Sequence, residues 1–136
     1  MEVRELTGDR ERRRAVPVLR QLWTDRDPDE IHAWTGQDEY HLVGGFVDGT
    51  LVSVAGVQVA GLLHHARQAW LYDLVVDEPR RGEGYGATLV DHVGAWARER
   101  DCEYVALASP LEKGDTHDFY DAREYERWGY VPQREL

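Results

Sequence analysis

The stretch Arg80-Arg81-Gly82-Glu83-Gly84-Tyr85-Gly86-Ala87 decides the fold of this chain. It lies between an apolar run at residues 70–76 and a helical pattern that continues to about residue 100. Three glycines within five residues let the backbone turn sharply and bring its N–H groups together where the helix begins. A helix N-terminus of this kind binds phosphate, and Arg81 and Arg80 add charge-assisted hydrogen bonds to an anion. We therefore predict a phosphate-binding loop at this position.

Two well-known phosphate motifs do not fit this loop. The spacing Gly82-x-Gly84-x-x-Ala87 formally satisfies the dinucleotide fingerprint, but in that motif the glycines directly follow the strand and open a longer sheet. Here five residues, Pro79 among them, separate the apolar run from Gly82, and only about fifty residues follow the loop. The lysine of a nucleoside-triphosphate loop is also missing. Both alternatives are therefore rejected.

The residues before the loop predict the antiparallel half of a mixed sheet. Residues 41–47 and 50–59 read as strands around Asp48-Gly49, a pair suited to a two-residue hairpin turn with positive φ at both positions. A short strand is expected at residues 1–6 and a helix at residues 9–23, with its regular part beginning near Pro17 or kinked there. A short helix is expected at residues 30–34, a polar turn at 61–68 and a buried strand at 70–76.

The pattern after the loop predicts a parallel crossover. The apolar run at 70–76, the helix that ends near Arg100 and a buried strand at 104–108 form a strand–helix–strand unit. A last helix capped by Asp115 or Thr116 runs to about residue 123, and residues 127–131 read as a terminal strand. The fold class is α/β: one domain over residues 1–136, a mixed sheet with an antiparallel N-terminal half and a parallel crossover that carries the loop.

The loop resembles the acetyl-CoA pyrophosphate loop of the GCN5-related N-acetyltransferase (GNAT) superfamily, in its spacing Arg81-x-x-Gly84-x-Gly86 between a strand and a helix. A second segment, Phe119-Tyr120-Asp121-Ala122-Arg123-Glu124-Tyr125, is similar to the late Phe-Tyr-Glu-x-x-Gly-Phe element of that family. The order and spacing of the expected strands and helices match as well, so the resemblance covers nearly the whole chain. A motif in its expected structural context weighs far more than the motif alone.

The resemblance implies a co-substrate and a set of contacts. In the family, the strand before the loop splays from the next parallel strand, and the pantetheine arm of acetyl-CoA lies in the gap. Tyr120 corresponds to the tyrosine that protonates the leaving thiolate. Carried over by position, the expected acetyl-CoA contacts are Leu74, Val75, Val76, Arg81, Gly82, Glu83, Gly84, Tyr85 and Gly86.

The chain departs from the family pattern at three points, the first being Pro79, which lies one place later than the family's usual proline. It has no Asn to follow the second parallel strand, so Ser109 or Asp115 substitutes for it or that contact is lost. Glu124 replaces the glycine of the late element, so the turn there is expected to differ. A competing register places Tyr125 rather than Tyr120 at the acid position. We prefer Tyr120, because residues 126–136 then suffice for a final strand.

Acetyl transfer needs an uncharged amine, a polarised thioester carbonyl and protonation of the sulfur as it leaves. The backbone N–H of Val76 is the candidate that polarises the carbonyl. Asp73 is the best candidate base, because it is an ionisable group in an otherwise apolar strand, where burial raises the pKa of a carboxyl. The alternatives are another carboxylate or a water, with Asp73 a structural residue bonded to backbone or to Arg.

The prediction is an enzyme, an N-acetyltransferase that moves the acetyl group of acetyl-CoA directly to an amine of a small molecule or peptide. Glu30 and Asp38 are candidates to orient a cationic amine, and Trp34 is a candidate wall of the acceptor pocket. The sequence does not indicate which amine is the acceptor. The alternative is a non-catalytic acyl-CoA-binding or regulatory module on the same scaffold.

Charge and composition bound the partners. A formal net charge of -10 repels phosphate backbones and anionic lipids, so neither nucleic acid nor a membrane is expected as a partner. A second copy of the chain, in a homodimer, is a possible partner.

No apolar signal segment follows Met1 and a single cysteine is present, which favours the cytoplasm. No metal is expected, since the adjacent His64 and His65 are poor joint ligands. One Lys among 16 basic residues and an acidic balance are typical of a surface adapted to concentrated salt.

Overall fold

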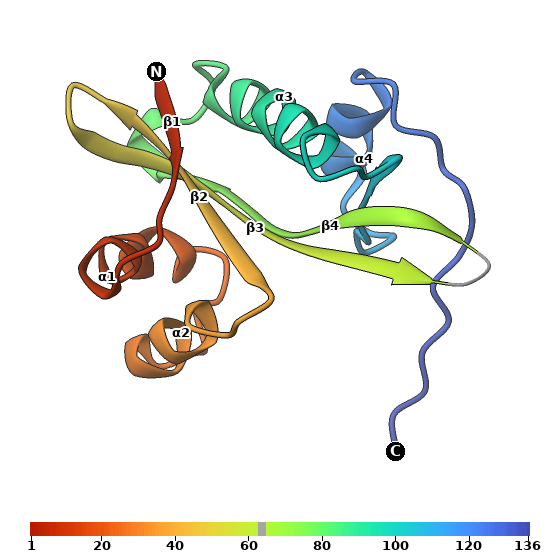
Figure 1. Cartoon of the computed structure of the whole chain (residues 1–136), viewed down its shortest axis with the longest axis horizontal. Helices are drawn as coiled ribbons and strands as arrows, with labels where there is room; N and C mark the ends of the chain where they lie inside the picture. Colours follow the sequence, from red (N-terminus) through yellow and green to blue (C-terminus); the bar gives the residue numbers. More distant parts are fainter. Residues whose placement is uncertain (63–64) are drawn as a thin grey trace. The chain divides into compact units, whose positions relative to one another are not determined.

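The computed structural model describes residues 1–62 and 65–136, with residues 62, 65 and 66 described by their backbone alone. The elements, labelled in Figure 1, are β1 (Glu2–Glu5), α1 (Asp9–Leu19), α2 (Pro28–Thr35), β2 (Tyr40–Val47), β3 (Thr50–Leu62), β4 (His65–Val76), η1 (Glu78–Arg80), α3 (Tyr85–Arg98), β5 (Tyr104–Ala106) and α4 (Gly114–Asp121). Residues 1–106 form one compact unit, which holds the sheet and α1–α3. Residues 107–136, with α4, form a second.

The sheet of the first unit has five strands in the order β1-β2-β3-β4-β5. The first three pairings are antiparallel, and β4 pairs with β5 in parallel. The β2–β3 hairpin turns at Asp48 (φ 49°) and Gly49 (φ 78°), so both central residues adopt the positive φ that the Asp-Gly pair predicted. The predicted fold class, a mixed α/β sheet with an antiparallel first half and a parallel crossover, is confirmed.

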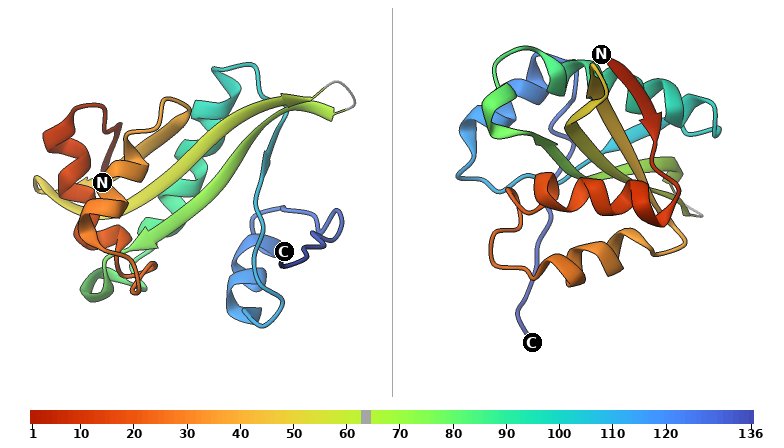
Figure 2. Two further views of the ribbon diagram at one scale, coloured as in Figure 1. Left: turned by 90° about the horizontal axis from the view of Figure 1, so that it is seen from below. Right: turned by 90° about the vertical axis from the view of Figure 1, so that its left-hand side faces the viewer.

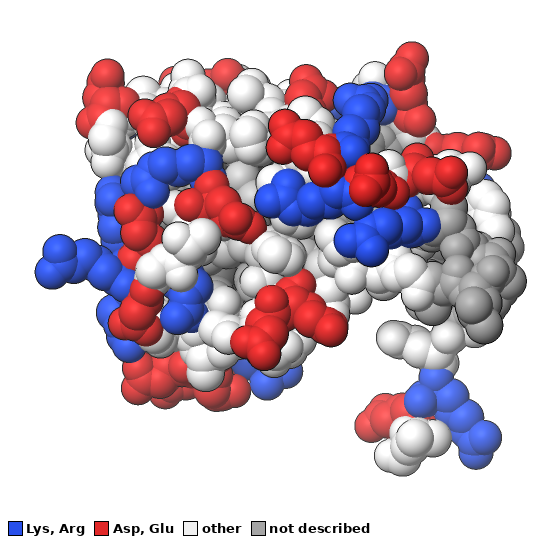
Figure 3. Space-filling model, viewed as in Figure 1, with Lys and Arg blue, Asp and Glu red and all other residues white. Residues whose placement is uncertain are grey.

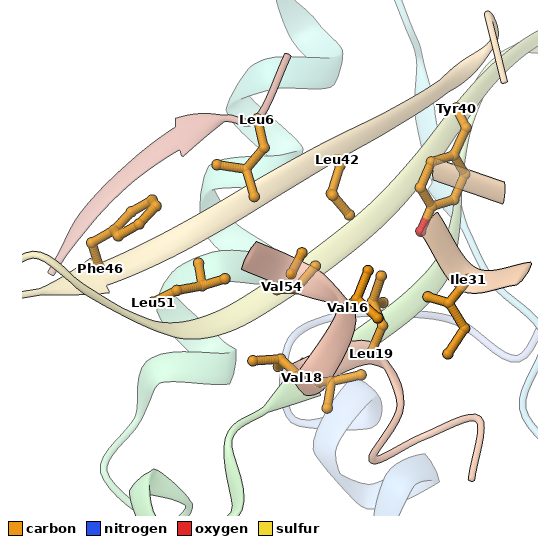
Figure 4. Packing of buried hydrophobic residues seen from close by; sticks show 12 residues of the cluster. Leu6, Val16, Val18, Leu19, Ile31, Tyr40, Leu42, Phe46, Leu51 and Val54 are labelled. Carbon is orange, nitrogen blue, oxygen red and sulfur yellow. The ribbon is translucent and has the colours of Figure 1, made fainter. Parts of the chain in front are cut away.

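Helices cover both faces of the sheet. Helices α1 and α2 lie on one face and α3 on the other (Figure 2). Figure 4 shows the core on the α1 face, where Val16 and Leu19 of α1 pack against Leu42 and Val54 of the sheet. Helix α3 buries an apolar stripe on its own side, formed by Leu89, Val90, Val93, Trp96 and Ala97. This two-sided burial explains why β2, β3 and the last part of β4 read as nearly continuous apolar runs.

The polar turn predicted at residues 61–68 is wrong, because strands occupy most of it. Strand β3 continues to Leu62 and β4 begins at His65, while His64 lies outside the described residues. In the outer arms of this hairpin Ala60 pairs with Gln68. The arms are only partly buried at residues 58–60 and 68, so polar residues are tolerated and the sequence lacks the alternation that marks a strand.

Three further expectations about the elements need correction. Helix α1 begins at Asp9 and runs through Pro17, which faces solvent, where water can bond the backbone carbonyl that a proline leaves without a donor. Strand β5 ends at Ala106 and is not buried, since Tyr104 is 61% exposed and the strand has only three ladder pairs. Helix α4 begins after Lys113 with no side-chain cap, so Asp115 and Thr116 lie inside it.

The terminal strand predicted at residues 127–131 is also wrong. Residues 126–136 have no regular secondary structure and are exposed throughout. The apolar side chains that suggested a strand, Trp128, Tyr130 and Val131, are 81%, 89% and 67% exposed. A strand needs a ladder as well as a pattern, and the sheet of the described residues is made of β1 to β5, without this segment.

Candidate functional site

Two of the three loop glycines occupy backbone conformations that other residues rarely adopt. Gly82 has φ +83° and Gly84 has φ +85°. A Cβ placed on either residue would meet no atom within 4 Å, so the space beside both is open. Gly86 lies in the first turn of α3. The backbone at Gly82 and Gly84 thus turns as predicted and is accessible to a ligand.

The N-terminus of α3 is uncapped. Gly84 is its N-cap residue, no side chain bonds to the first turn, and that turn carries no acidic residue. The first N–H groups of a helix have no intrahelical partner, and the helix dipole places partial positive charge there. Because residues 81–84 are exposed, these donors at Tyr85, Gly86 and Ala87 are open to an anion.

The connector between β4 and the loop is fixed by a residue that sequence reasoning missed. The Gln21 side chain donates to Asp77 Oδ1 (2.6 Å) and accepts from the Glu78 backbone N–H (3.0 Å) and from Arg81 Nη2 (3.3 Å). Arg81 also donates through Nε to the Val76 carbonyl at 3.0 Å. The guanidinium of Arg81 is therefore held beside the end of β4 with further N–H groups left over.

The edge of β4 opens toward the loop. Its parallel ladder with β5 ends at the pair Trp70 and Ala106, so among the described strands residues 71–76 pair with β3 alone. A bulge at this point leaves Tyr72 between the pairs Leu71–Val57 and Asp73–Gly56. A bulge bends its strand and increases the local twist. The geometry agrees with the splay that the resemblance implied for this strand.

The backbone groups of Leu74 and Val76 face this open edge. The Asp77 N–H donates to the Val52 carbonyl of β3 at 2.8 Å. Because backbone groups alternate in direction along a strand, those of Val76 and Leu74 point the other way. The bond from Arg81 to the Val76 carbonyl lies on that side as well. Val75, the third expected contact on this strand, instead faces β3 with its backbone and has its side chain in the core.

Asp73 lies inside a hydrogen-bonded cluster. It is 4% exposed, its Oδ1 accepts from the indole Nε1 of Trp23 at 2.7 Å, and its Oδ2 accepts from the hydroxyl of Tyr40 at 2.7 Å. Its partners are thus neither backbone nor Arg, as the structural alternative had supposed. Gly56 makes the cluster possible, because a Cβ there would overlap the Tyr40 hydroxyl.

Burial raises the pKa of Asp73 above its ordinary value, and the hydrogen bonds from Tyr40 and Trp23 act against that rise. Burial also raises the pKa of Tyr40 well above its ordinary value, as does the neighbouring Asp73. Tyr40 therefore stays protonated and remains a donor at neutral pH. Sequence reasoning found Asp73 but missed Tyr40 and Trp23. The available signal was Gly56, since a glycine inside a strand marks close approach by another group.

Of the three acceptor candidates, Trp34 alone joins this cluster. Its ring contacts that of Tyr40 edge-on at 5.9 Å, and Trp34 is 48% exposed. Glu30 forms an ion pair with Arg26 at 3.6 Å, and the charge of Arg26 offsets part of the negative charge of Glu30. Asp38 is exposed in the turn before β2. The structure thus connects Asp73 to an exposed aromatic side chain through Tyr40.

The second unit holds both tyrosines that compete for the acid position. Tyr120 on α4 is 9% exposed, and its ring contacts that of Tyr125 at 5.2 Å. Burial raises the pKa of Tyr120 to about 12, with a further rise from Tyr125. Tyr120 is therefore protonated at neutral pH, as an acid must be. The rings of the two competing tyrosines are thus in contact. The final strand for which Tyr120 was preferred is not formed by residues 126–136, so burial and not chain length now favours Tyr120.

The turn after α4 differs from expectation. Glu124 was expected to change the turn because it replaces a glycine, yet it adopts φ 67°, the conformation that a glycine would supply. The N–H groups of Glu124 and Tyr125 bond back to Asp121 and Tyr120 at 3.3 and 3.2 Å, the pattern of a Schellman helix end. The glycine-like turn is kept without the glycine.

Ser109 and Asp115, the two candidates for the missing Asn, differ in their surroundings. The Ser109 Oγ is buried and has no hydrogen-bond partner among the described residues. Asp115 is exposed on α4. A buried hydroxyl without a partner is costly unless something satisfies it, so Ser109 is the better candidate.

Within residues 1–61 and 67–136, no three His, Cys, Asp or Glu side chains gather in a metal-binding group. No helix in the described part of the chain is long and apolar enough to cross a bilayer. Figure 3 shows acidic and basic side chains interspersed over one face, with no continuous basic surface there.

Residues 5–129 match the family model described as Acetyltransferase (GNAT) family. The chain is also similar to an uncharacterized N-acetyltransferase, YhdJ, of Bacillus subtilis (strain 168). The two are 27% identical over 124 residues, which cover 88% of this chain and 87% of that protein.

Solved structures share the fold. An aminoglycoside N-acetyltransferase in complex with CoA superposes with a TM-score of 0.87 at 16% identity, covering 99% of this chain and 93% of that one. A ribosomal-protein-alanine N-acetyltransferase from Brucella melitensis biovar Abortus 2308 superposes with a TM-score of 0.83 at 21% identity, covering 99% and 100%.

Proposed function

The chain belongs to the acetyltransferase (GNAT) family, and we propose that it transfers the acetyl group of acetyl-CoA directly to an amine of a small molecule or peptide. Members of this family use acetyl-CoA as the acetyl donor. The observation that carries the proposal is the open, uncapped N-terminus of α3 behind two left-handed glycines, beside the unpaired edge of β4. We assign the activity to a single domain over residues 1–136.

The α3 N-terminus is the proposed pyrophosphate site. Backbone N–H groups from Gly82 to Gly86, with Glu83 and Tyr85 between the glycines, surround the anion, and the helix dipole favours its charge. Arg81 adds positive charge from its position beside the Val76 carbonyl. Open space next to Gly82 and Gly84 supports this assignment, because a phosphate must approach the backbone closely.

The free edge of β4 is the proposed site of the pantetheine arm. Amide groups of the arm pair with the backbone of Leu74 and with the second acceptor site of the Val76 carbonyl, as a short added strand would. The N–H of Val76 is the donor proposed to polarise the thioester carbonyl, because it faces that edge. Val75 supports the strand through its buried side chain.

Asp73 and Tyr120 are the proposed base and acid. The carboxylate of Asp73 takes the proton of the acceptor ammonium, and the amine then attacks the thioester carbon. Tyr120 protonates the thiolate as the carbon–sulfur bond breaks. The raised pKa of Asp73 brings it closer to the working pH of a base, and the protonated state of Tyr120 suits an acid.

An amine panel assayed by CoA thiol release tests the proposal. It contains aminoglycosides, peptides with free N-termini, polyamines and arylalkylamines, each at equal concentration with acetyl-CoA in excess. We expect one class to give thiol release above the rate without amine, with mass spectrometry finding an acetamide product. Binding of acetyl-CoA without turnover of any amine would instead favour the acyl-CoA-binding module.

A further inference from the structure

Asp73 is a buried carboxyl without a cation. Among the described residues no Arg, Lys or His forms an ion pair with it. Its two partners, Tyr40 and Trp23, are neutral donors, one on each oxygen. Buried acidic groups with a purely structural role are usually paired with a positive charge. Neutral donors hold a carboxylate in place but leave its charge uncancelled.

The residues packed around Tyr40 fix the position of its hydroxyl. Tyr40 begins β2 and is 8% exposed, and its ring lies at the α2 end of the core near Ile31 (Figure 4). Trp34 contacts the ring edge-on at 5.9 Å. The space that the hydroxyl fills exists only because residue 56 is glycine. The packing thus aims one donor at one oxygen of Asp73.

We propose that Tyr40 is a positioning residue for acetyl transfer: its hydroxyl bond to Oδ2, with the Trp23 indole on Oδ1, orients the Asp73 carboxylate and keeps it ionised to accept the acceptor's proton. This inference rests on the proposed role of Asp73 as the base. Each carboxylate oxygen can accept two hydrogen bonds and receives one, from Trp23 or from Tyr40. Both oxygens therefore keep a site that can take a proton.

The ammonium of the acceptor gives one proton to Asp73, and the free amine forms the new nitrogen–carbon bond while the carbon–sulfur bond breaks. The nitrogen loses its second proton to solvent, and the CoA thiolate gains one from Tyr120. Solvent then returns a proton to Tyr120 and removes the one on Asp73. The products are the acetamide, CoA thiol and one released proton.

The direction of the pH effect follows from the groups around Asp73. Burial raises its pKa, and the hydrogen bonds of Tyr40 from β2 and Trp23 from the segment after α1 lower it. Strand β3 presents Gly56, which carries no charge. Removing the Tyr40 hydroxyl therefore raises the pKa of Asp73. The acidic limb of the pH–rate profile, where a base must lose its proton, then moves to higher pH.

Tyr40→Phe is the test, read out as kcat/KM against pH for an amine that the panel identifies as acceptor. We expect the midpoint of the acidic limb to rise, with much of the lost rate regained at alkaline pH. Tyr104→Phe is the matched control, because it removes a hydroxyl from a tyrosine that is 61% exposed on β5 and outside the cluster. That variant should keep the wild-type profile. A uniform loss at every pH in Tyr40→Phe, with the midpoint unchanged, would contradict a positioning role.

A second measurement keeps the inference testable where Tyr40→Phe has little activity. Carbon-13 NMR of aspartate-labelled protein titrates Asp73 directly, its signal assigned by its absence in Asp73→Asn. The pKa should be higher in Tyr40→Phe than in the wild type, and an equal pKa would overturn the inference. If Asp73→Asn keeps full activity and the same acidic limb, then the proposed base is wrong, which is a different outcome.

Discussion

Tyr120 and Tyr125 offer the sharpest choice at the scale of single residues. Their ring centroids are 5.2 Å apart, so both registers place the proposed acid in the same part of the second unit. Tyr120 is the more buried of the two, and its pKa of about 12 keeps it protonated at neutral pH.

Tyr120→Phe should lower turnover by about 10² to 10⁴, the usual range for general acid catalysis, and leave acetyl-CoA binding nearly intact. Steady-state kinetics with calorimetry of acetyl-CoA binding measures both. Tyr125→Phe is the control and should keep most of its activity. The reverse result, with Tyr125→Phe impaired and Tyr120→Phe active, means that the late motif is displaced by five residues.

The buried Asp73 also makes stability depend on pH. Its pKa is raised in the native state above the ordinary value of 3.8, so the native protein binds this proton more tightly than the unfolded chain. The resulting stabilisation is complete below pH 3.8 and is lost as the pH rises through the native pKa.

Asp73→Asn isolates this contribution, because it removes the titrating group. The free energy of unfolding of the wild type relative to the variant should increase as the pH falls. Each tenfold difference between native and unfolded proton affinity contributes about 1.4 kcal/mol. Urea unfolding of both proteins across a pH series checks this, and a difference that does not vary with pH would contradict the burial of an ionisable carboxyl.

At the scale of elements, two helices end in a left-handed residue that is not glycine. Asp101 after α3 has φ 60°, and the N–H groups of Asp101 and Cys102 bond back to Arg98 and Ala97 at 3.1 Å each. Glu124 after α4 repeats the pattern. Both are Schellman ends in which a Cβ is crowded against its own backbone.

Asp101→Gly should therefore increase the free energy of unfolding by about 1 kcal/mol, since glycine adopts this conformation without strain. Thermal or urea unfolding measures the gain. Asp101→Ala serves as the control, because it removes the carboxylate and keeps the Cβ. Equal stability of the Gly and Ala variants would show that the backbone conformation does not limit this helix end.

Whether the sequence predicts an element depends on which interactions hold that element in place. The Asp48-Gly49 turn and the α3 stripe were predictable, because local φ preference and burial against one surface leave a pattern. The outer arms of β3 and β4 and the end of the chain were not. The arms are strands without full burial, and residues 127–131 have a strand pattern without a ladder partner.

The candidate site divides in the same way. The glycine loop and Asp73 stand out in the sequence, because each is an exception within its surroundings. Gln21, Trp23 and Tyr40 do not, since each meets its partner only through the fold. Gln21 lies 56 positions from Asp77, and Trp23 and Tyr40 lie 50 and 33 positions from Asp73. A single sequence does not reveal such pairings.

At the scale of the whole molecule, the negative net charge bears on stability. The formal charge of -10 at pH 7 comes from 26 acidic and 16 basic residues. At low ionic strength, repulsion among like charges destabilises a compact state, and salt screens it over about 10 Å at 0.1 M. The adaptation to concentrated salt that the composition suggests stays a prediction.

The melting temperature should rise as potassium chloride increases from millimolar to molar concentration. Differential scanning fluorimetry measures it, and sucrose at matched osmolality separates screening from general osmolyte stabilisation. A flat or falling curve in salt would leave the acidic, lysine-poor composition without a role in stability.

The central claim is that the loop before α3 binds acetyl-CoA. Isothermal titration calorimetry of the wild type and of Gly84→Val tests it most directly. Valine at φ +85° is strained, and its side chain fills the open space beside the backbone where the pyrophosphate is proposed to lie. Circular dichroism establishes that the variant is folded.

We predict saturable binding by the wild type and an affinity at least about tenfold lower in Gly84→Val, a loss of about 1.4 kcal/mol or more. Absence of wild-type binding at millimolar acetyl-CoA, or equal affinity in a folded Gly84→Val, would contradict it.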